Sequence, residues 1–290
     1  MLRAAVDIGT NSMRLLVVDE SGGEISRIQR VTGLGGGVDA SGRFDSEAVE
    51  RTIEVLAAFG DVIKTIPVKR AVATSASRDA SDRELFFDRA EQALGIRPEV
   101  ISGMEEAELS YAGATEGAPG THVVVDIGGG SSEFVWRGEA GLMARSFDIG
   151  SVRLTERALS NRPASFEEVE TAASQCEVMF QGLDGLPDRF DVIGVAGTWT
   201  SLAAIAAESA DRSAVHLFRL ERTETDRMVG RLASMSLTAI AALPGLDPAR
   251  APVILAGAVV AREAMRALAA DHVTVSERDL LDGVVASLEA

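Results

Sequence analysis

A strand–turn–strand motif built around Asp-Ile-Gly occurs twice in this chain, in the same register. The copy that starts at Val6 reads V-D-I-G-T-N-S-M-R-L-L-V, and the copy that starts at Val125 reads V-D-I-G-G-G-S-S-E-F-V-W. Each has an apolar strand, an acid, a turn rich in Gly, Ser and Thr, and a second apolar strand. The duplication predicts two similar α/β domains that present the same kind of turn.

The composition of the two turns is typical of phosphate binding. Glycine lets backbone N–H groups approach an oxyanion, and the hydroxyl groups add further donors. One copy alone favours an ordinary hairpin turn, whereas two copies in register favour a phosphorylated ligand held between them. The predicted phosphate-binding residues are Gly9, Thr10, Asn11, Ser12 and Arg14 in the first copy and Gly128, Gly129, Gly130, Ser131 and Ser132 in the second.

Acidic residues stand at the ends of the first strands. Asp7 and Asp126 would repel a phosphate unless a cation lay between them, so we interpret both as direct or water-mediated partners of Mg²⁺. The alternative is a carboxylate that caps its own turn. Glu133 occupies the position that Arg14 has in the first copy, and it is either a second acid on the metal side or a solvated strand residue.

Three further segments carry candidate site residues. Arg78 follows an apolar strand and a loop of small residues, where it can clamp a phosphate or form a surface ion pair. Glu105 and Glu106 lie in the first turn of an expected helix, where acids favour the helix dipole and where one of them could accept a proton from an attacking water. The segment 197–201, G-T-W-T-S, is either another anion site at a helix start or a simple cap.

Charge and composition exclude several classes of protein. The formal net charge of −16 argues against nucleic-acid binding, which needs a basic face. No apolar run is long enough for a signal peptide or a membrane span, so no membrane partner is expected. The single Cys176 is interpreted as a core residue and fits a reducing cytoplasm. The three histidines, His122, His216 and His272, show no metal-ligand spacing.

The order of expected elements defines the domains. Three strands joined by short turns (3–7, 12–19 and 24–31) predict an antiparallel meander, and helices and strands alternate after it. Helices are expected at 46–59, 83–94 and 103–111, and strands at 68–74 and 97–101. The turn-rich stretch 113–120 is the best candidate for a linker, which gives domains of 1–118 and 119–290. The second domain is expected to hold a hairpin at 122–136, a strand at 192–195, and helices at 166–181, 201–207, 252–265 and 276–288.

Taken together, these segments resemble the exopolyphosphatase/guanosine pentaphosphate phosphohydrolase family of the actin/sugar-kinase superfamily. The similarity runs along nearly the whole chain, and the hairpins alone mark only the superfamily. More specific are A-T-S-A-S-R-D-A, which contains Arg78, and S-G-M-E-E-A, which contains Glu106. Ser132 and Asp82 stand where threonine and asparagine are usual, and Pro252 stands where the family usually has an aspartate, which puts that position's role in doubt.

The resemblance implies a fold and an activity. It implies two ribonuclease-H-like α/β lobes with the active site in the cleft between them, and a last helix, about 280–290, that packs back on the first lobe. It implies hydrolysis of the terminal phosphoanhydride of inorganic polyphosphate with Mg²⁺, or alternatively Mn²⁺, as cofactor. Glu106 matches the catalytic base, Arg78 the phosphate clamp, and Asp126 and Glu133 the acids of the metal and phosphate site. A homodimer is also expected by resemblance.

Other functions remain open at this point. The substrate can equally be guanosine pentaphosphate, a nucleotide of the stringent response. The loops would contact phosphate groups and not the leaving group, so they do not distinguish the two substrates. A kinase of the same superfamily would leave the E-E-A segment unexplained. A sensor that binds polyphosphate or alarmone without turnover is a further class. The acidic net charge leaves little for an extended basic track and so predicts a preference for short polyphosphates.

Overall fold

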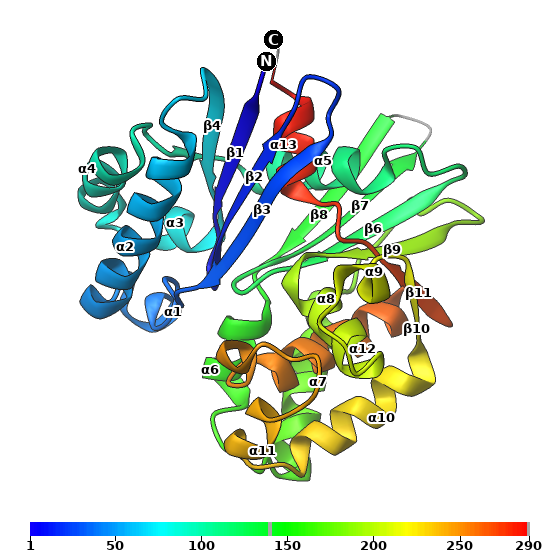
Figure 1. The fold of residues 1–290 in the computed structure, drawn as a ribbon. Coiled ribbons are helices and arrows are strands. Elements are labelled where there is room, and N and C mark those ends of the chain that lie inside the picture. The colour runs from blue at the N-terminus through cyan, green and yellow to red at the C-terminus, as the bar shows by residue number, and fades with distance from the viewer. Residues whose placement is uncertain (139–140, 289–290) are drawn as a thin grey trace. The chain divides into compact units, whose positions relative to one another are not determined.

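The computed structural model describes residues 1–138 and 141–288, and the chain divides into two compact units (Figure 1). Unit 1 comprises Met1–Gly113 together with Asp279–Ala290, and unit 2 comprises Ala114–Arg278. The chain therefore passes from one unit to the other twice, after Gly113 and after Arg278. The sequence placed a single boundary after residue 118, with a last helix returning to the first lobe.

Unit 1 contains a five-stranded mixed sheet with the order β3-β2-β1-β4-β5. The first three strands pair antiparallel, as their short connecting turns predict, and β4 and β5 join parallel on the other side of β1. The strands are β1 (Arg3–Ile8), β2 (Ser12–Val18), β3 (Glu24–Val31), β4 (Val68–Ala73) and β5 (Glu99–Val100).

Side chains that alternate along β1 bury both faces of this sheet. Ala4 and Val6 face a core that includes Leu56 and Phe86 of two helices, whereas Ala5 faces a second cluster with Leu281 of the last helix. Figure 1 shows this last helix, in red, beside β1 and β2. The helices of unit 1 are α1 (Val38–Ser41), α2 (Ser46–Ile63), α3 (Ser75–Asp79), α4 (Arg83–Leu94), α5 (Gly103–Thr115) and α13 (Leu280–Ala286).

Unit 2 repeats the same sheet and extends it by one strand. Its order is β10-β11-β9-β6-β7-β8, in which β6, β7 and β8 pair antiparallel and β9 and β11 follow β6 in parallel. Without β10 this is the topology of unit 1, so the duplicated motif reflects a duplicated fold. The strands are β6 (His122–Ile127), β7 (Ser132–Gly138), β8 (Gly141–Phe147), β9 (Asp191–Val195), β10 (Phe218–Glu221) and β11 (His272–Val275).

One hydrophobic core fills unit 2. Trp136 and Trp199 are fully buried in it, and Phe134, Phe147 and Phe180 contact one another with ring centroids 4.9–5.6 Å apart. None of the described helices is both long and apolar enough to cross a membrane. The helices are α6 (Ser151–Ala158), α7 (Phe166–Met179), α8 (Ala196–Ala206), α9 (Arg212–Val215), α10 (Arg222–Ala233), α11 (Leu237–Ala241), the 3-10 turn η1 (Pro248–Arg250) and α12 (Ile254–Ala267).

The expected α/β class, the first meander and the helices α2, α4, α5, α7, α8 and α12 are confirmed. The sequence did not predict the strands β8, β10 and β11 or the helices α1, α3, α6, α9, α10 and α11. The segment 276–288, expected to be one helix, contains α13 only from Leu280 to Ala286. Short elements give little periodic pattern, which fits the missed strands of four to seven residues, but α10 has twelve residues and was missed as well.

Candidate functional site

Each of the two glycine-containing turns has the same hydrogen bond. In unit 1 the N–H of Gly9 donates to the carbonyl oxygen of Ser12 over 3.1 Å, and in unit 2 the N–H of Gly128 donates to Ser131 over 3.0 Å. Both turns lie at the carboxyl end of the first strand of their unit. The match in sequence is therefore a match in backbone geometry.

The carbonyl groups of the first turn are held by the glycine-rich loop that follows β3. The N–H of Gly35 donates to the oxygen of Thr10 over 2.8 Å, and Thr32 and Gly33 both donate to the oxygen of Asn11 over 3.0 Å. Because the C=O and N–H of a trans peptide point in opposite directions, the N–H groups of Asn11 and Ser12 point away from this loop. The first turn thus directs donors to the side where an anion could bind.

The second turn is held in the same way, but by a helix. The N–H groups of Ser151 and Val152 donate to the oxygens of Gly128 and Gly129 over 3.0 and 2.8 Å. The Nε of Arg153 donates to the oxygen of Gly130 over 2.8 Å. A Cβ atom on Gly150 would lie 2.6 Å from the carbonyl group of Gly129, so helix α6 can approach the turn only with glycine there.

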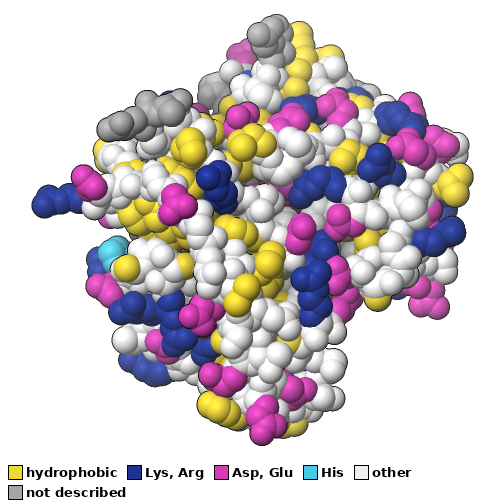
Figure 2. Space-filling view, turned by 180° about the vertical axis from the view of Figure 1, so that it is seen from behind, with side chains coloured by type: hydrophobic (Ala, Val, Ile, Leu, Met, Phe, Trp, Pro, Cys, Tyr) yellow, Lys and Arg dark blue, Asp and Glu magenta, His cyan; other side chains and the backbone are white. Residues whose placement is uncertain are grey.

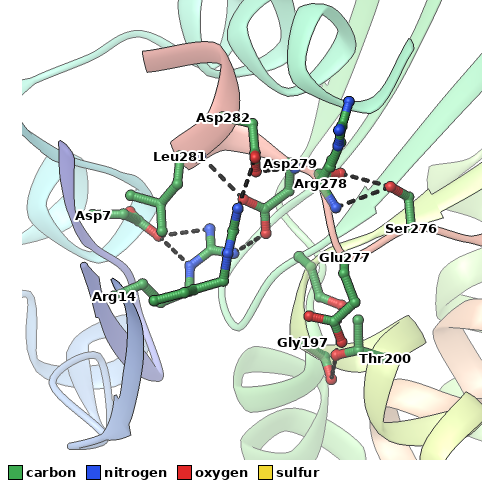
Figure 3. A network of polar contacts seen from close by, with 12 residues as sticks. Asp7, Arg14, Gly197, Thr200, Ser276, Glu277, Arg278, Asp279, Leu281 and Asp282 are labelled. Carbon is green, nitrogen blue, oxygen red and sulfur yellow. Dashed lines mark hydrogen bonds and ion pairs between the residues drawn. The ribbon is translucent and has the colours of Figure 1, made fainter. Parts of the chain in front are cut away.

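Arg14 forms ion pairs with two buried acids of unit 1, as Figure 3 shows. Its Nη2 lies 2.7 Å from Oδ2 of Asp7, which is its cross-strand partner in the β1–β2 register. Its Nη1 contacts Oδ2 of Asp279, the residue that caps the N-terminus of α13. Burial raises the pKa of Asp7, and the charge of Arg14 counters this effect. Asp7 therefore already has a cation beside it, supplied by the protein.

A second arginine attaches α13 to the sheet. Nη2 of Arg27 in β3 lies 2.7 Å from Oδ1 of Asp282, and Asp282 in turn accepts the backbone N–H of Asp279. Burial raises the pKa of Asp282, and the neighbouring charge of Asp279 raises it further. The first turn of α13 is thus fixed by two arginines, one of which lies beside the first phosphate turn.

Arg78 and Glu106 form a single ion pair, in which Nη1 lies 2.7 Å from Oε2. Glu106 is 7% exposed, and its burial raises the pKa of the carboxyl group, while the charge of Arg78 opposes the shift. The same Nη1 also donates to the carbonyl oxygen of Ile101 over 3.0 Å, which fixes the guanidinium at the start of α5. The adjacent Glu105 instead pairs with Arg70 over 2.7 Å and is considerably more exposed.

Four buried polar atoms around the first turn have no hydrogen-bond partner among the described residues. They are Oδ1 of Asp7, Nδ2 of Asn11, Oγ1 of Thr32 and Oγ of Ser77, which precedes Arg78 in α3. Buried polar groups are nearly always satisfied, so such a group calls for an explanation. A polar ligand at this turn would supply the missing partners.

Unit 2 places two acids directly opposite each other. Asp126 and Glu133 are partners in the β6–β7 register, and they are 5% and 1% exposed. Like charges opposite one another on a sheet are destabilising, so the pair suits a bound cation. Among residues 1–138 and 141–288, no three acids, histidines or cysteines cluster as a metal site. This fits Mg²⁺, which commonly takes one or two carboxylates and completes its shell with water and substrate phosphate.

The segment 197–201 opens α8, as expected, and the structure adds a buried arginine to it. A Cβ on Gly197 would lie 2.2 Å from Nη2 of Arg250, so the guanidinium lies directly on the first turn of the helix. The preceding Ala196 has a φ of 69°, in the left-handed region that non-glycine residues seldom adopt. Strained backbone of this kind clusters at ligand sites, and β9 places it at the same sheet edge as the second turn.

Two similar α/β units, each with a glycine turn, a buried acid at the strand end and nearby arginines, define a phosphoryl-binding protein of the duplicated actin-like class. The model of the Ppx/GppA phosphatase family matches residues 16–290, and the chain belongs to this family. The chain is 40% identical to exopolyphosphatase 2 of Mycobacterium tuberculosis over 98% of both proteins.

Solved structures agree with this assignment. An exopolyphosphatase-like protein superposes with a TM-score of 0.91 at 35% identity, covering 99% of this chain and 98% of the other. The Ppx/GppA family member of Aquifex aeolicus superposes with a TM-score of 0.80 at 29% identity, covering 99% and 97%. The expected family and two-lobed fold class are therefore confirmed.

The structure gathers some predicted site residues and leaves other roles as predictions. Within unit 1 it brings Asp7, Arg14, Arg78 and Glu106 together, since the charges of Asp7 and Arg14 both act on the carboxyl of Glu106. Arg14, predicted to bind phosphate, is already bound by two carboxylates. Sequence reasoning missed Arg153, Arg250 and Asp279. All three lie in segments that resemble the family, I-G-S-V-R, A-R-A-P and V-S-E-R-D, but the pairing of Asp279 with Arg14, far away in the chain, had no local signal.

Proposed function

We propose that this protein is an exopolyphosphatase that hydrolyses the terminal phosphoanhydride of inorganic polyphosphate and releases orthophosphate. The observation that carries the proposal is the buried Glu106 paired with Arg78 in the unit that holds the first phosphate turn. A relative that matches this chain from end to end is named an exopolyphosphatase.

Glu106 would act as the base that orients a water and accepts its proton. Burial raises the pKa of its carboxyl group, which makes the carboxylate a stronger proton acceptor than an exposed glutamate. Arg78 holds the carboxylate through Nη1 alone, so the second oxygen of the glutamate is left for water. Phosphoryl transfer needs mainly positioning and charge stabilisation, which these fixed groups can supply.

Unit 2 would contribute the cation site through Asp126 and Glu133. Mg²⁺, or Mn²⁺ in its place, would neutralise phosphate oxygens when bound there. Ser146 donates to Oε1 of Glu133 over 2.8 Å and so fixes the orientation of that acid. The donors of the second turn and the Arg250 guanidinium would bind further phosphate oxygens.

Short polyphosphates are the proposed substrates. The chain has 28 basic and 44 acidic residues, and many arginines are already paired, as Arg97 is with Glu84, Asp88 and Glu91. On the face in Figure 2, basic and acidic side chains are interspersed. A long polyanion gains affinity only from an extended positive track, which such a surface does not offer.

We also propose a cytoplasmic homodimer.

The test is orthophosphate release in the presence of Mg²⁺ from a short polyphosphate, a long polyphosphate and guanosine pentaphosphate at equal concentrations of chain ends. Release mainly from the short polyphosphate is the expected result. Faster release from chains of hundreds of units would contradict the short-chain proposal. Release mainly from the nucleotide would assign alarmone hydrolysis instead, and binding without release would assign a sensor.

A further inference from the structure

Unit 2 contains a cavity of about 490 Å³ that none of the proposed chemistry uses. Its lining begins at His122 and Asp191, the first residues of β6 and β9, and extends along the sheet to Thr274 and Ser276 at the end of β11. The second glycine-containing turn follows the carboxyl end of β6, so the length of the strand places His122 about 17–20 Å from that turn. We name this cavity the His122 pocket.

His122 is a buried residue of this pocket with unsatisfied polar atoms. It is 6% exposed, and neither Nδ1 nor Nε2 has a hydrogen-bond partner among the residues that the structure describes. A neutral imidazole carries one donor and one acceptor, and a buried group of this kind that stays unsatisfied destabilises the folded protein. A ligand group that accepts from the ring N–H or donates to the other ring nitrogen would reduce this destabilisation.

The other walls indicate the character of the ligand. Pro119, Ile193 and Leu217 give apolar surfaces. Asp191 provides a carboxylate that can accept from N–H groups, and Glu116 and Arg278 already pair with each other over 3.3 Å. Because Arg278 is already paired and Asp191 adds a carboxylate to the wall, the pocket disfavours an anionic ligand. Its volume lies within the roughly 300–1,000 Å³ of ordinary small-molecule sites.

The pocket also lies where the chain enters and leaves unit 2. Its lining includes Ala114 and Arg278, the first and last residues of the unit. Ala114 belongs to α5, the helix that carries Glu106, and Arg278 precedes Asp279, which holds Arg14. A ligand here would contact the segments that lead directly to both groups.

Inside unit 1, α5 and the segment that begins α13 lie in close backbone contact, with no room for a side chain between them. A Cβ on Gly113 of α5 would lie 2.1 Å from the carbonyl oxygen of Asp279, and a Cβ on Gly283 of α13 would lie 2.0 Å from the oxygen of Leu109. Helices in such close contact move together and not past each other. A shift imposed at the pocket end of α5 would therefore reach the start of α13.

We propose that the His122 pocket is a regulatory site for an uncharged nitrogen heterocycle of the purine-nucleoside class. One atom of the ring edge would form a hydrogen bond with a nitrogen of His122, its N–H groups would donate to Asp191, and its faces would contact the apolar walls. The regulatory part rests on the proposed hydrolysis, whereas the binding part does not.

Guanosine and adenosine are the probes, because neither contains a phosphate that the two turns could bind. Isothermal titration of the full chain should show binding that His122→Phe weakens at least about tenfold, since that change removes both ring nitrogens and keeps the ring. His272→Phe is the matched control, a histidine of unit 2 outside the pocket. Ala118→Phe, which fills the pocket and leaves His122 in place, should also abolish binding.

The proposal would be overturned if neither nucleoside bound. It would also be overturned if the wild type and both pocket variants bound equally well. Regulation is tested by the rate of orthophosphate release from a short polyphosphate with and without saturating nucleoside. A change of about fivefold or more that is lost in His122→Phe is expected. Binding without a change in rate would refute regulation alone. A protein that binds nucleoside but releases phosphate from no substrate would refute the hydrolysis and not the binding site.

Discussion

Arg78 and Glu106 lie on different helices of unit 1 and meet through one hydrogen bond, 2.7 Å between Nη1 and Oε2. The pair places a buried carboxylate and a fixed guanidinium in the same unit as the first glycine-containing turn. Glu105, one residue earlier, pairs with Arg70 and is 40% exposed at its side chain. Neighbouring acids of one helix thus have different environments, which makes each a control for the other.

Replacing Glu106 by glutamine should lower turnover by about 10²- to 10⁴-fold with little change in KM, because the amide cannot accept a proton from water. Glu105→Gln should retain near-normal turnover. Steady-state orthophosphate release measures both variants, and circular dichroism checks their folding. Near-normal turnover in Glu106→Gln would remove Glu106 from the role of base.

The pH profile should respond to Arg78. Burial raises the pKa of Glu106 above its ordinary value of 4.5, and Arg78 lowers it again. The base works as the carboxylate, so kcat/KM should fall as the pH falls through this pKa. Without the guanidinium charge, in Arg78→Gln, the fall should begin at a higher pH, and Arg78→Lys should shift it less. Arg70→Gln, which affects Glu105, should leave the profile in place.

Asp279→Asn tests the attachment of α13 to Arg14. Asparagine can still cap the helix, but it cannot neutralise Arg14, so the free energy of unfolding should fall by about 1–3 kcal/mol. Denaturant titration measures this loss. Glu99→Gln, which breaks the exposed half of the Arg70 cluster, should cost less than about 1 kcal/mol. KM should also rise, since Arg14 lies beside the first turn, and a loss of stability with unchanged KM would make Asp279 purely structural.

Gly35→Ala tests the support of the first turn. Its Cβ would lie 2.3 Å from Cγ2 of Thr10, so the turn must shift and KM for polyphosphate should rise. Thr10→Ser removes that methyl group and keeps the hydroxyl, so the double variant should recover part of the lost affinity. Gly230→Ala is the control, because its Cβ would meet nothing within 4 Å. An unaltered KM in Gly35→Ala would show that the turn does not bind substrate.

Local sequence determined the parts of this protein that depend on neighbours in the chain. The duplicated hairpins, the antiparallel meander and the helix that carries Glu106 follow from alternation, glycine placement and capping, which act over a few residues. The same motifs identified the first turn with Asp7 and the second with Asp126.

Only the tertiary structure decided which charges meet. Arg14 pairs with Asp279, although the two are separated by nearly the whole chain, because α13 returns to the sheet of unit 1. Arg250 lies on Gly197 because a glycine leaves room for the guanidinium there. The unsatisfied His122 likewise follows from burial by segments far from it in sequence. Desolvation and ion pairing depend on distances in space, and no local pattern in the chain encodes those distances.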